Sequence, residues 1–339
     1  MTKQSNTPAR QRSLYTAENL RWLGDLDPLP PFSDAAGFEQ ARLEAAVFSA
    51  FAGLGIYTQH AGGVHWTRQM SDGTICVHMD STLAEFDSPS DGTVSSNHEP
   101  GYGVAEPIVQ SLLPVRMTEY FNGAAGVRIA AAKGRDLHLT LIGAETARLT
   151  LRAAKWVDWQ AILEKHARSI AVDGQRPLWE EPKATRLEQQ ELASYRSHSN
   201  TSRLASALLR RVGLFHRVAF AHSISAWTWG RDVWKLEIYS DPCRGPVHQA
   251  FLDALTDPKF GIPLQVQWDW CVCGHPERRM NCELTLELTH STKTKLVLRF
   301  ISEALPTGLH WPAEIPRSAR GKSAEKMNRR SLLSQSSEE

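Results

Sequence analysis

The chain has 339 residues, of which 42% are hydrophobic and 22% charged, and its net charge is +1. This length suffices for two ordinary domains, and the composition is typical of a soluble globular protein. The small net charge argues against a whole-molecule field that would attract nucleic acid or a membrane. No apolar run approaches the roughly 18 residues of a membrane span, and no secretory signal is predicted. The odd number of cysteines, five, is typical of reduced thiols, so we expect a cytoplasmic location.

The first half is expected to alternate helices with strand hairpins. Residues 1–37 are predicted as a polar tail with one short helix. A helix follows from Phe38, where apolar residues recur at helical spacing. Asp72 and Gly73 stand between two alternating runs, which is a strong hairpin signal. After a long loop at 84–105, of a length that is usually functional or disordered, a second helix and three strands complete the half.

A hairpin of this half recurs later in the chain. Residues 139–152 read L-T-L-I-G-A-E-T-A-R-L-T-L-R, and residues 286–299 read L-E-L-T-H-S-T-K-T-K-L-V-L-R. A Trp-Thr pair also lies in the first hairpin of each half, at Trp66 and Trp227. Both halves therefore read α-β-β-α-β-β-β. This order predicts an α+β fold built from two tandem copies of one unit, with antiparallel sheets, helices on one face of each, and a pseudo-twofold relation.

The predicted boundaries follow from these two copies. The chain divides into an N-terminal tail with a short helix, a first repeat, a helical linker, a second repeat and a basic tail, at residues 1–37, 38–155, 156–201, 202–305 and 306–339. The last segment is rich in serine, lysine and arginine and is predicted to be disordered.

One stretch of the second repeat, C-V-C-G-H-P-E-R-R-M-N-C, offers soft metal ligands. Three thiols and an imidazole near one hairpin match the donors of tetrahedral zinc. The predicted ligands are Cys271, Cys273, His275 and Cys282. The Cys-x-Cys spacing departs from the usual Cys-x2-Cys of zinc sites. The alternative interpretation is therefore that these are thiols on a hairpin without a metal, and no other cofactor is predicted.

Tryptophans and cations crowd the second repeat. The predicted partner-binding residues are Trp227, Trp229, Trp268, Trp270, Arg231 and Lys235. Each tryptophan pair is spaced i, i+2, so its two side chains share one face of a strand. Three interpretations remain open: the core face of a sheet, a protein interface enriched in Trp and Arg, or a nucleic-acid surface that stacks bases. Residues 200–300 carry more cations than anions, and residues 38–155 the reverse.

Signals for catalysis are weak. His60, His65, His78, Asp80 and Cys76 lie near one hairpin, and a histidine with an acid can transfer protons. Cys76 and His78 alternate with apolar residues, however, and no partner spacing marks a nucleophile. Phosphate-binding, zinc-protease and nucleophile-elbow motifs are absent from the sequence, so no catalytic residue is assigned.

The sequence therefore favours a non-catalytic cytoplasmic binding or adaptor protein that belongs to a larger protein assembly and acts through the tryptophan-rich second half. The alternative is a nucleic-acid-binding protein that uses the basic second half and the C-terminal tail. An oligomer is compatible with either reading, and the identity of the partner does not follow from the sequence.

Overall fold

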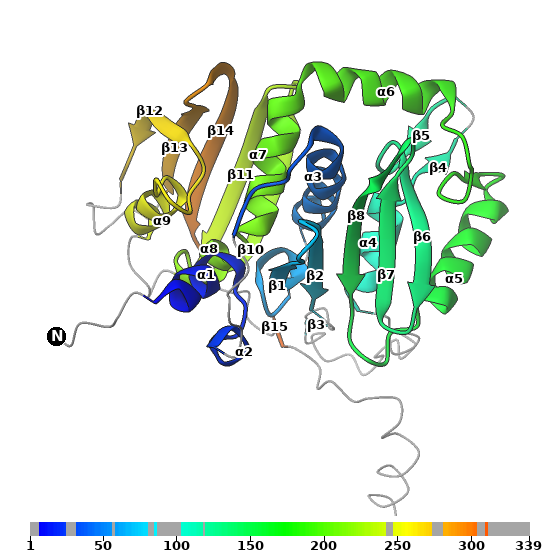
Figure 1. Ribbon diagram of the computed structural model, residues 1–339, viewed down its shortest axis with the longest axis horizontal. Coiled ribbons are helices and arrows are strands. Elements are labelled where there is room, and N and C mark those ends of the chain that lie inside the picture. Colours follow the sequence, from blue (N-terminus) through cyan, green and yellow to red (C-terminus); the bar gives the residue numbers. More distant parts are fainter. Residues whose placement is uncertain are drawn as a thin grey trace, which may run out of the picture.

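Two five-stranded sheets form the framework of the computed structural model, which describes residues 7–24, 32–55, 58–80, 85–86, 103–117, 119–241, 247–272, 281–303 and 309–310. The first sheet has the order β1-β2-β8-β7-β6 and the second the order β10-β11-β14-β13-β12 (Figure 1). The strands of the first sheet are β1 Val64–Gln69, β2 Ile75–Met79, β6 Val127–Lys133, β7 Asp136–Leu141 and β8 Ala144–Arg152. Those of the second are β10 Ala221–Trp229, β11 Val233–Ser240, β12 Leu264–Trp270, β13 Asn281–Leu288 and β14 Ser291–Ser302.

Each sheet contains one parallel pair, which corrects the prediction of wholly antiparallel sheets. β2 pairs with β8 in parallel, and so does β11 with β14, while the other neighbours are antiparallel. Between the two members of each parallel pair the chain passes through a helix, and such a crossover can join strands that run the same way. The fold is therefore mixed α+β, with mixed sheets.

Hairpin turns were predicted where glycines allow a left-handed backbone. Gly73 has φ +81° between β1 and β2, and Gly230 has φ +65° between β10 and β11. Residues with a side chain rarely adopt such angles, so glycine favours these turns.

Two helices lie side by side at the centre of the molecule, with one sheet on each side in the view of Figure 1. The helices with eight or more residues are α1 Pro8–Thr16, α3 Phe38–Gly53, α4 Ala105–Leu112, α5 Trp159–Val172, α6 Arg186–Ser197, α7 Ser199–Arg210 and α9 His248–Leu255. The central pair is α3 and α7. Helix α3 is buried on nearly all sides, from Gln40 to Ala52, because it packs on β8, α7 and β10. Its buried surface is mostly apolar but includes the polar side chains Gln40, Arg42 and Glu44.

The hydrophobic core is continuous between the predicted repeats. Phe48 of α3 meets Trp234 of β11 edge to face, with ring centroids 5.7 Å apart. The Trp234 indole N–H donates to the carbonyl of Thr201 at 3.0 Å. One cluster of buried side chains includes residues of both predicted repeats and of the predicted linker.

The remaining elements are short, and they lie both inside the predicted repeats and in the segments predicted as tail, loop or linker. They are α2 Leu20–Gly24, η1 Ala61–Gly63, β3 Glu85–Phe86, β4 Val115–Arg116, β5 Phe121–Asn122, β9 Arg176–Pro177, α8 Gly213–Arg217 and β15 Leu309–His310. The N-terminal segment forms two helices, α1 and α2, instead of the one predicted. Arg12 and Glu18 explain its unexpected burial, because their ion pair of 2.7 Å lets both charged groups leave water. Most of the predicted loop and of the predicted C-terminal tail lies outside the described residues. The described parts are residues 85–86 and 103–105 of the loop and 309–310 of the tail.

Gly213 begins α8, where the chain passes close to α1. A Cβ at this position would lie 2.4 Å from the Leu14 carbonyl oxygen and 2.6 Å from the Ala17 nitrogen. Gly213→Ala is therefore expected to lower the free energy of unfolding by about 1–3 kcal/mol, the usual cost of overpacking. Urea unfolding measures this change. Gly53→Ala is the control, because its Cβ would approach no other heavy atom closer than 4.0 Å, and it should be neutral or stabilising. Equal midpoints for the two variants would contradict the prediction.

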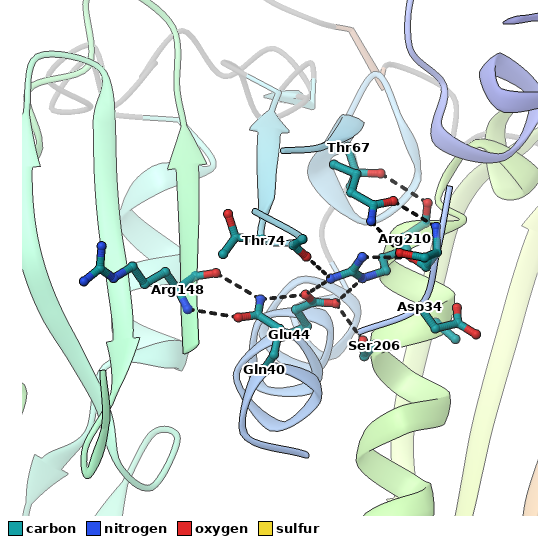
Figure 2. Close-up of polar contacts among 12 residues, drawn as sticks. Asp34, Gln40, Glu44, Thr67, Thr74, Arg148, Ser206 and Arg210 are labelled. Atoms are coloured by element: carbon teal, nitrogen blue, oxygen red, sulfur yellow. Dashed lines mark hydrogen bonds and ion pairs between the residues drawn. The ribbon is translucent and has the colours of Figure 1, made fainter. Parts of the chain in front are cut away.

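A buried polar network joins α3 to α7 (Figure 2). Arg210 Nε and Nη2 contact the two carboxylate oxygens of Glu44 at 2.7 and 2.5 Å. Ser206 and Gln40 donate to the same carboxylate at 2.6 and 2.7 Å. Gln40 also pairs with both backbone groups of Arg148 on β8. Both members of the ion pair are almost inaccessible to solvent, so the network fixes how the two helices and the first sheet meet.

Candidate functional site

Four tryptophans of the second sheet lie on its solvent-facing side. Trp227, Trp229, Trp268 and Trp270 are 43%, 67%, 49% and 45% exposed. Trp234, by contrast, points to the opposite face and is 4% exposed. The interpretation of the two pairs as a core face is therefore wrong. We call Trp227, Trp229, Lys235, Trp268 and Trp270 together the tryptophan face.

The strand register places the two tryptophan pairs at opposite edges of this face. Trp227 pairs with Lys235, Lys235 with Val297, Val297 with Thr285, and Thr285 with Trp268. This row crosses all five strands. Four strand spacings of about 4.8 Å separate its ends by about 19 Å. The two tryptophan pairs therefore border a polar strip about 19 Å wide.

Opposite charges are paired within the strip. Arg299 lies 3.0 Å from Glu237, and Lys295 lies 2.8 Å from Glu287. Lys235 Nζ lies 4.1 Å from the centroid of the Trp229 ring, which is a cation–π contact. Paired cations offer little to a row of phosphates, whereas exposed Trp side chains are typical of protein interfaces, where aromatic residues are enriched.

Strand β12 ends the second sheet on one side. Its residues from Gln265 to Trp270 are all exposed. Among the described residues no strand pairs with its outer edge. The backbone donors and acceptors on that edge can therefore receive an added strand.

Arg231, the sixth predicted partner-binding residue, lies apart from the tryptophan face. It stands in the β10–β11 turn, 3.6 Å from Glu191 of α6. It lines a cavity of ≈ 880 Å³ together with residues of α3, α6 and α7. Arg42 also lines this cavity, and its guanidinium stacks 3.6 Å from the Tyr195 ring centroid. Burial lowers the pKa of Arg42, and its Nε has no hydrogen-bond partner within the described part of the chain.

The structure divides the predicted histidine group between two places. His60 Nδ1 lies 2.7 Å from Asp80 Oδ1, and the rings of His60 and His65 stack at 4.1 Å. His78 instead stacks on Trp66 at 3.2 Å. Burial raises the pKa of the Cys76 thiol to about 11, so at neutral pH it is not a nucleophilic thiolate. No arrangement of nucleophile and base forms here among the described residues.

Sequence reasoning missed a third imidazole beside His60 and His65. His216 of α8 lies with its ring centroid 5.1 Å from that of His60, and its Nε2 lies 2.7 Å from the carbonyl oxygen of Val64. Burial lowers the pKa of His216 to about 3, which keeps the ring neutral at physiological pH. No local pattern connects this residue with His60, because the two come from different halves of the chain.

Two of the four predicted metal ligands come together at the end of the β12–β13 hairpin where the chain passes from β12 to β13. Cys271 Sγ lies 3.5 Å from Cys282 Sγ. The imidazole beside them belongs to His248 of α9, whose Nε2 is 3.6 Å from Cys271 Sγ. The other two predicted ligands, Cys273 and His275, lie outside the described residues. His248 was missed because it stands far from the cysteine pattern in sequence and begins a helix.

Comparison of the chain with protein-family models, with curated proteins and with solved structures finds no match. Within the described ranges, no helix combines the length and the apolar character that crossing a bilayer requires. Function therefore has to be argued from the surfaces and clusters of this chain alone.

Proposed function

We propose that this chain is a non-catalytic binding protein that holds a protein partner on the tryptophan face, as an adaptor within a larger assembly. The observation that carries the proposal is the exposure of four tryptophans on one face of a sheet. Large apolar side chains clustered in water commonly mark an interaction surface. A rigid sheet that presents Trp beside a cation also has the chemistry of an interface hot spot.

The partner segment is proposed to be extended and to carry an aromatic side chain. Strand β12 supports the extended form, because its free edge can pair with a peptide while Trp268 and Trp270 contact alternate side chains. The first half supports the aromatic side chain. There Trp66, on the first sheet, is covered by Trp22 of α2, with ring centroids 5.5 Å apart. Trp227 lies on the corresponding hairpin of the second sheet and remains exposed.

Tandem duplication of one unit is part of this proposal. Its support is the identical strand order in the two sheets and the single parallel pair in each. On this reading the two units diverged in their outer faces. The first became covered by the N-terminal segment, and the second kept its tryptophans for a partner.

The test begins with mass spectrometry of the native protein from its own cells, with and without nuclease, and continues with binding assays on the partner so identified. Trp229→Ala and Trp270→Ala are each expected to weaken binding by about 30-fold, the effect of losing about 2 kcal/mol at a hot spot. Val172→Ala is the matched control, because Val172 is 87% exposed on α5, at the other side of the molecule in Figure 1, and should bind normally.

The same complex tests the extended segment. Amide hydrogen exchange within residues 264–270 should slow on binding, because a paired edge strand loses its contact with water. Unchanged affinity in both tryptophan variants would contradict the proposed face. If the co-purifying partner is instead nucleic acid, affinity should fall by roughly one log unit per log of salt for each phosphate contact, and the adaptor proposal fails.

A further inference from the structure

We propose that His248, Cys271 and Cys282 bind a zinc ion. The three residues come from separate elements: His248 begins α9, Cys271 directly follows β12, and Cys282 is in β13. Their ligand atoms all lie within 4.8 Å of one another. Cys271 directly follows Trp270 of the tryptophan face, but the zinc proposal does not depend on a partner binding there.

The distances fit tetrahedral zinc. Bonds of about 2.3 Å to sulfur and about 2.0 Å to nitrogen place two sulfurs about 3.8 Å apart, and a sulfur about 3.6 Å from a nitrogen. The observed separations are 3.5 Å between the two sulfurs and 3.6 Å between Cys271 Sγ and His248 Nε2. Both separations lie within a few tenths of an ångström of zinc geometry, and the third pair, Cys282 Sγ and the His248 ring nitrogen, lies within 4.8 Å.

The donor chemistry selects the metal. Two thiolates and an imidazole are soft or borderline ligands, which favour zinc over magnesium and calcium. An imidazole binds a metal through a ring nitrogen that carries no proton, and His248 Nε2 is the nitrogen that lies beside Cys271 Sγ. Binding would displace the thiol protons of the two cysteines to solvent, since thiolate is the ligand.

The ion would fasten the loop end of the β12–β13 hairpin to the first turn of α9. β12 is the outermost described strand of its sheet and has a neighbour on one side only. A metal ligand immediately after Trp270 therefore limits the fraying of this strand. Metal removal should accordingly increase amide exchange in residues 264–270 more than in β14, which lies between two strands.

Metal content of the full chain, purified under reducing conditions without chelator, tests the proposal. We expect about one zinc per chain in the wild type, because the three residues form one site, and the same in Cys76→Ser, whose thiol lies elsewhere. Cys271→Ser and Cys282→Ser should lose most of the zinc. His248→Gln should lower the affinity, whereas His275→Gln should retain the ion. Cobalt substitution gives a second readout, because tetrahedral thiolate ligation produces a charge-transfer band that Cys271→Ser should abolish.

Cys271 is exposed, so Cys271→Ser keeps the test decisive even if Cys282→Ser, at a buried position, fails to fold. Three results would overturn the proposal. They are a wild-type chain without zinc after dialysis against the ion, undiminished zinc in Cys271→Ser, or a Cys271–Cys282 disulfide found by mass spectrometry in the reduced preparation.

Discussion

Replacing Glu44 with alanine is expected to lower the free energy of unfolding by about 3–5 kcal/mol, the cost of removing one member of a buried ion pair. Arg210 would keep its bonds to the carbonyls of Ser33 and Gly73, but its charge would have no counterion. Ser206 and Gln40 would each lose the carboxylate to which they donate. Chemical denaturation of the two proteins at pH 7 measures the difference.

Two further variants separate the buried charge from the rest of the change. Glu39→Ala removes an acid from the same helix that pairs with Arg196 at 3.4 Å and is exposed to solvent, so it should cost less than about 1 kcal/mol. Arg210→Met added to Glu44→Ala should restore part of the lost stability, because no unpaired charge then remains buried. A double variant no more stable than Glu44→Ala would show that the unpaired arginine is not the cause.

Replacing Glu188 with glutamine is expected to cost about 3 kcal/mol, since it leaves the buried Arg128 without its counterion. Glu188 lies 2.8 Å from Arg128 Nη1, accepts the backbone N–H groups of Gly126 and Thr185, and forms the capping box of α6 with Thr185. Burial alone would raise the pKa of Glu188, but these hydrogen bonds outweigh it and lower the pKa.

The lowered pKa fixes the pH dependence. A carboxyl group whose pKa is lower in the folded than in the unfolded state stabilises the fold above its unfolded pKa, about 4.3, and this contribution is lost as the pH falls through the folded value. Glu188→Gln should therefore flatten the loss of stability below about pH 4.3, measured by denaturation at several pH values. Glu39→Gln, at a surface carboxylate that pairs with Arg196, is the matched control. Parallel curves for wild type and Glu188→Gln would contradict the assignment.

The order of helices and strands could be predicted from local signals, whereas the pairing of distant strands could not. Gly73 and Gly230 mark hairpin turns that can be recognised in the sequence, because few other residues adopt the backbone angles of these turns. That Ile75 lies beside Leu149 depends on where a crossover returns the chain to the sheet. Neither the hydrophobic periodicity nor a turn residue indicates that β2 pairs with β8.

A signal for the exposed tryptophans was present in the sequence. On β10, Trp227 and Trp229 share their face with Ser225, while Ile224 and Ala226 take the other face. Strict alternation would have assigned the tryptophans to solvent. The cysteine pattern likewise predicted two thiols that do meet. The cysteine pattern missed His248, because this residue lies on helix α9, which approaches the cysteines only in the folded chain.

The burial of α3 on nearly every side has a consequence for synthesis. During translation the first sheet and α3 leave the ribosome before α7 and β10 exist, so the surfaces of α3 that these elements cover remain open to water. β2 cannot pair with β8 until the whole meander has emerged. The nascent first half is therefore expected to attract chaperones. A chain terminated before α7 should aggregate, because it lacks the elements of the second half that cover α3.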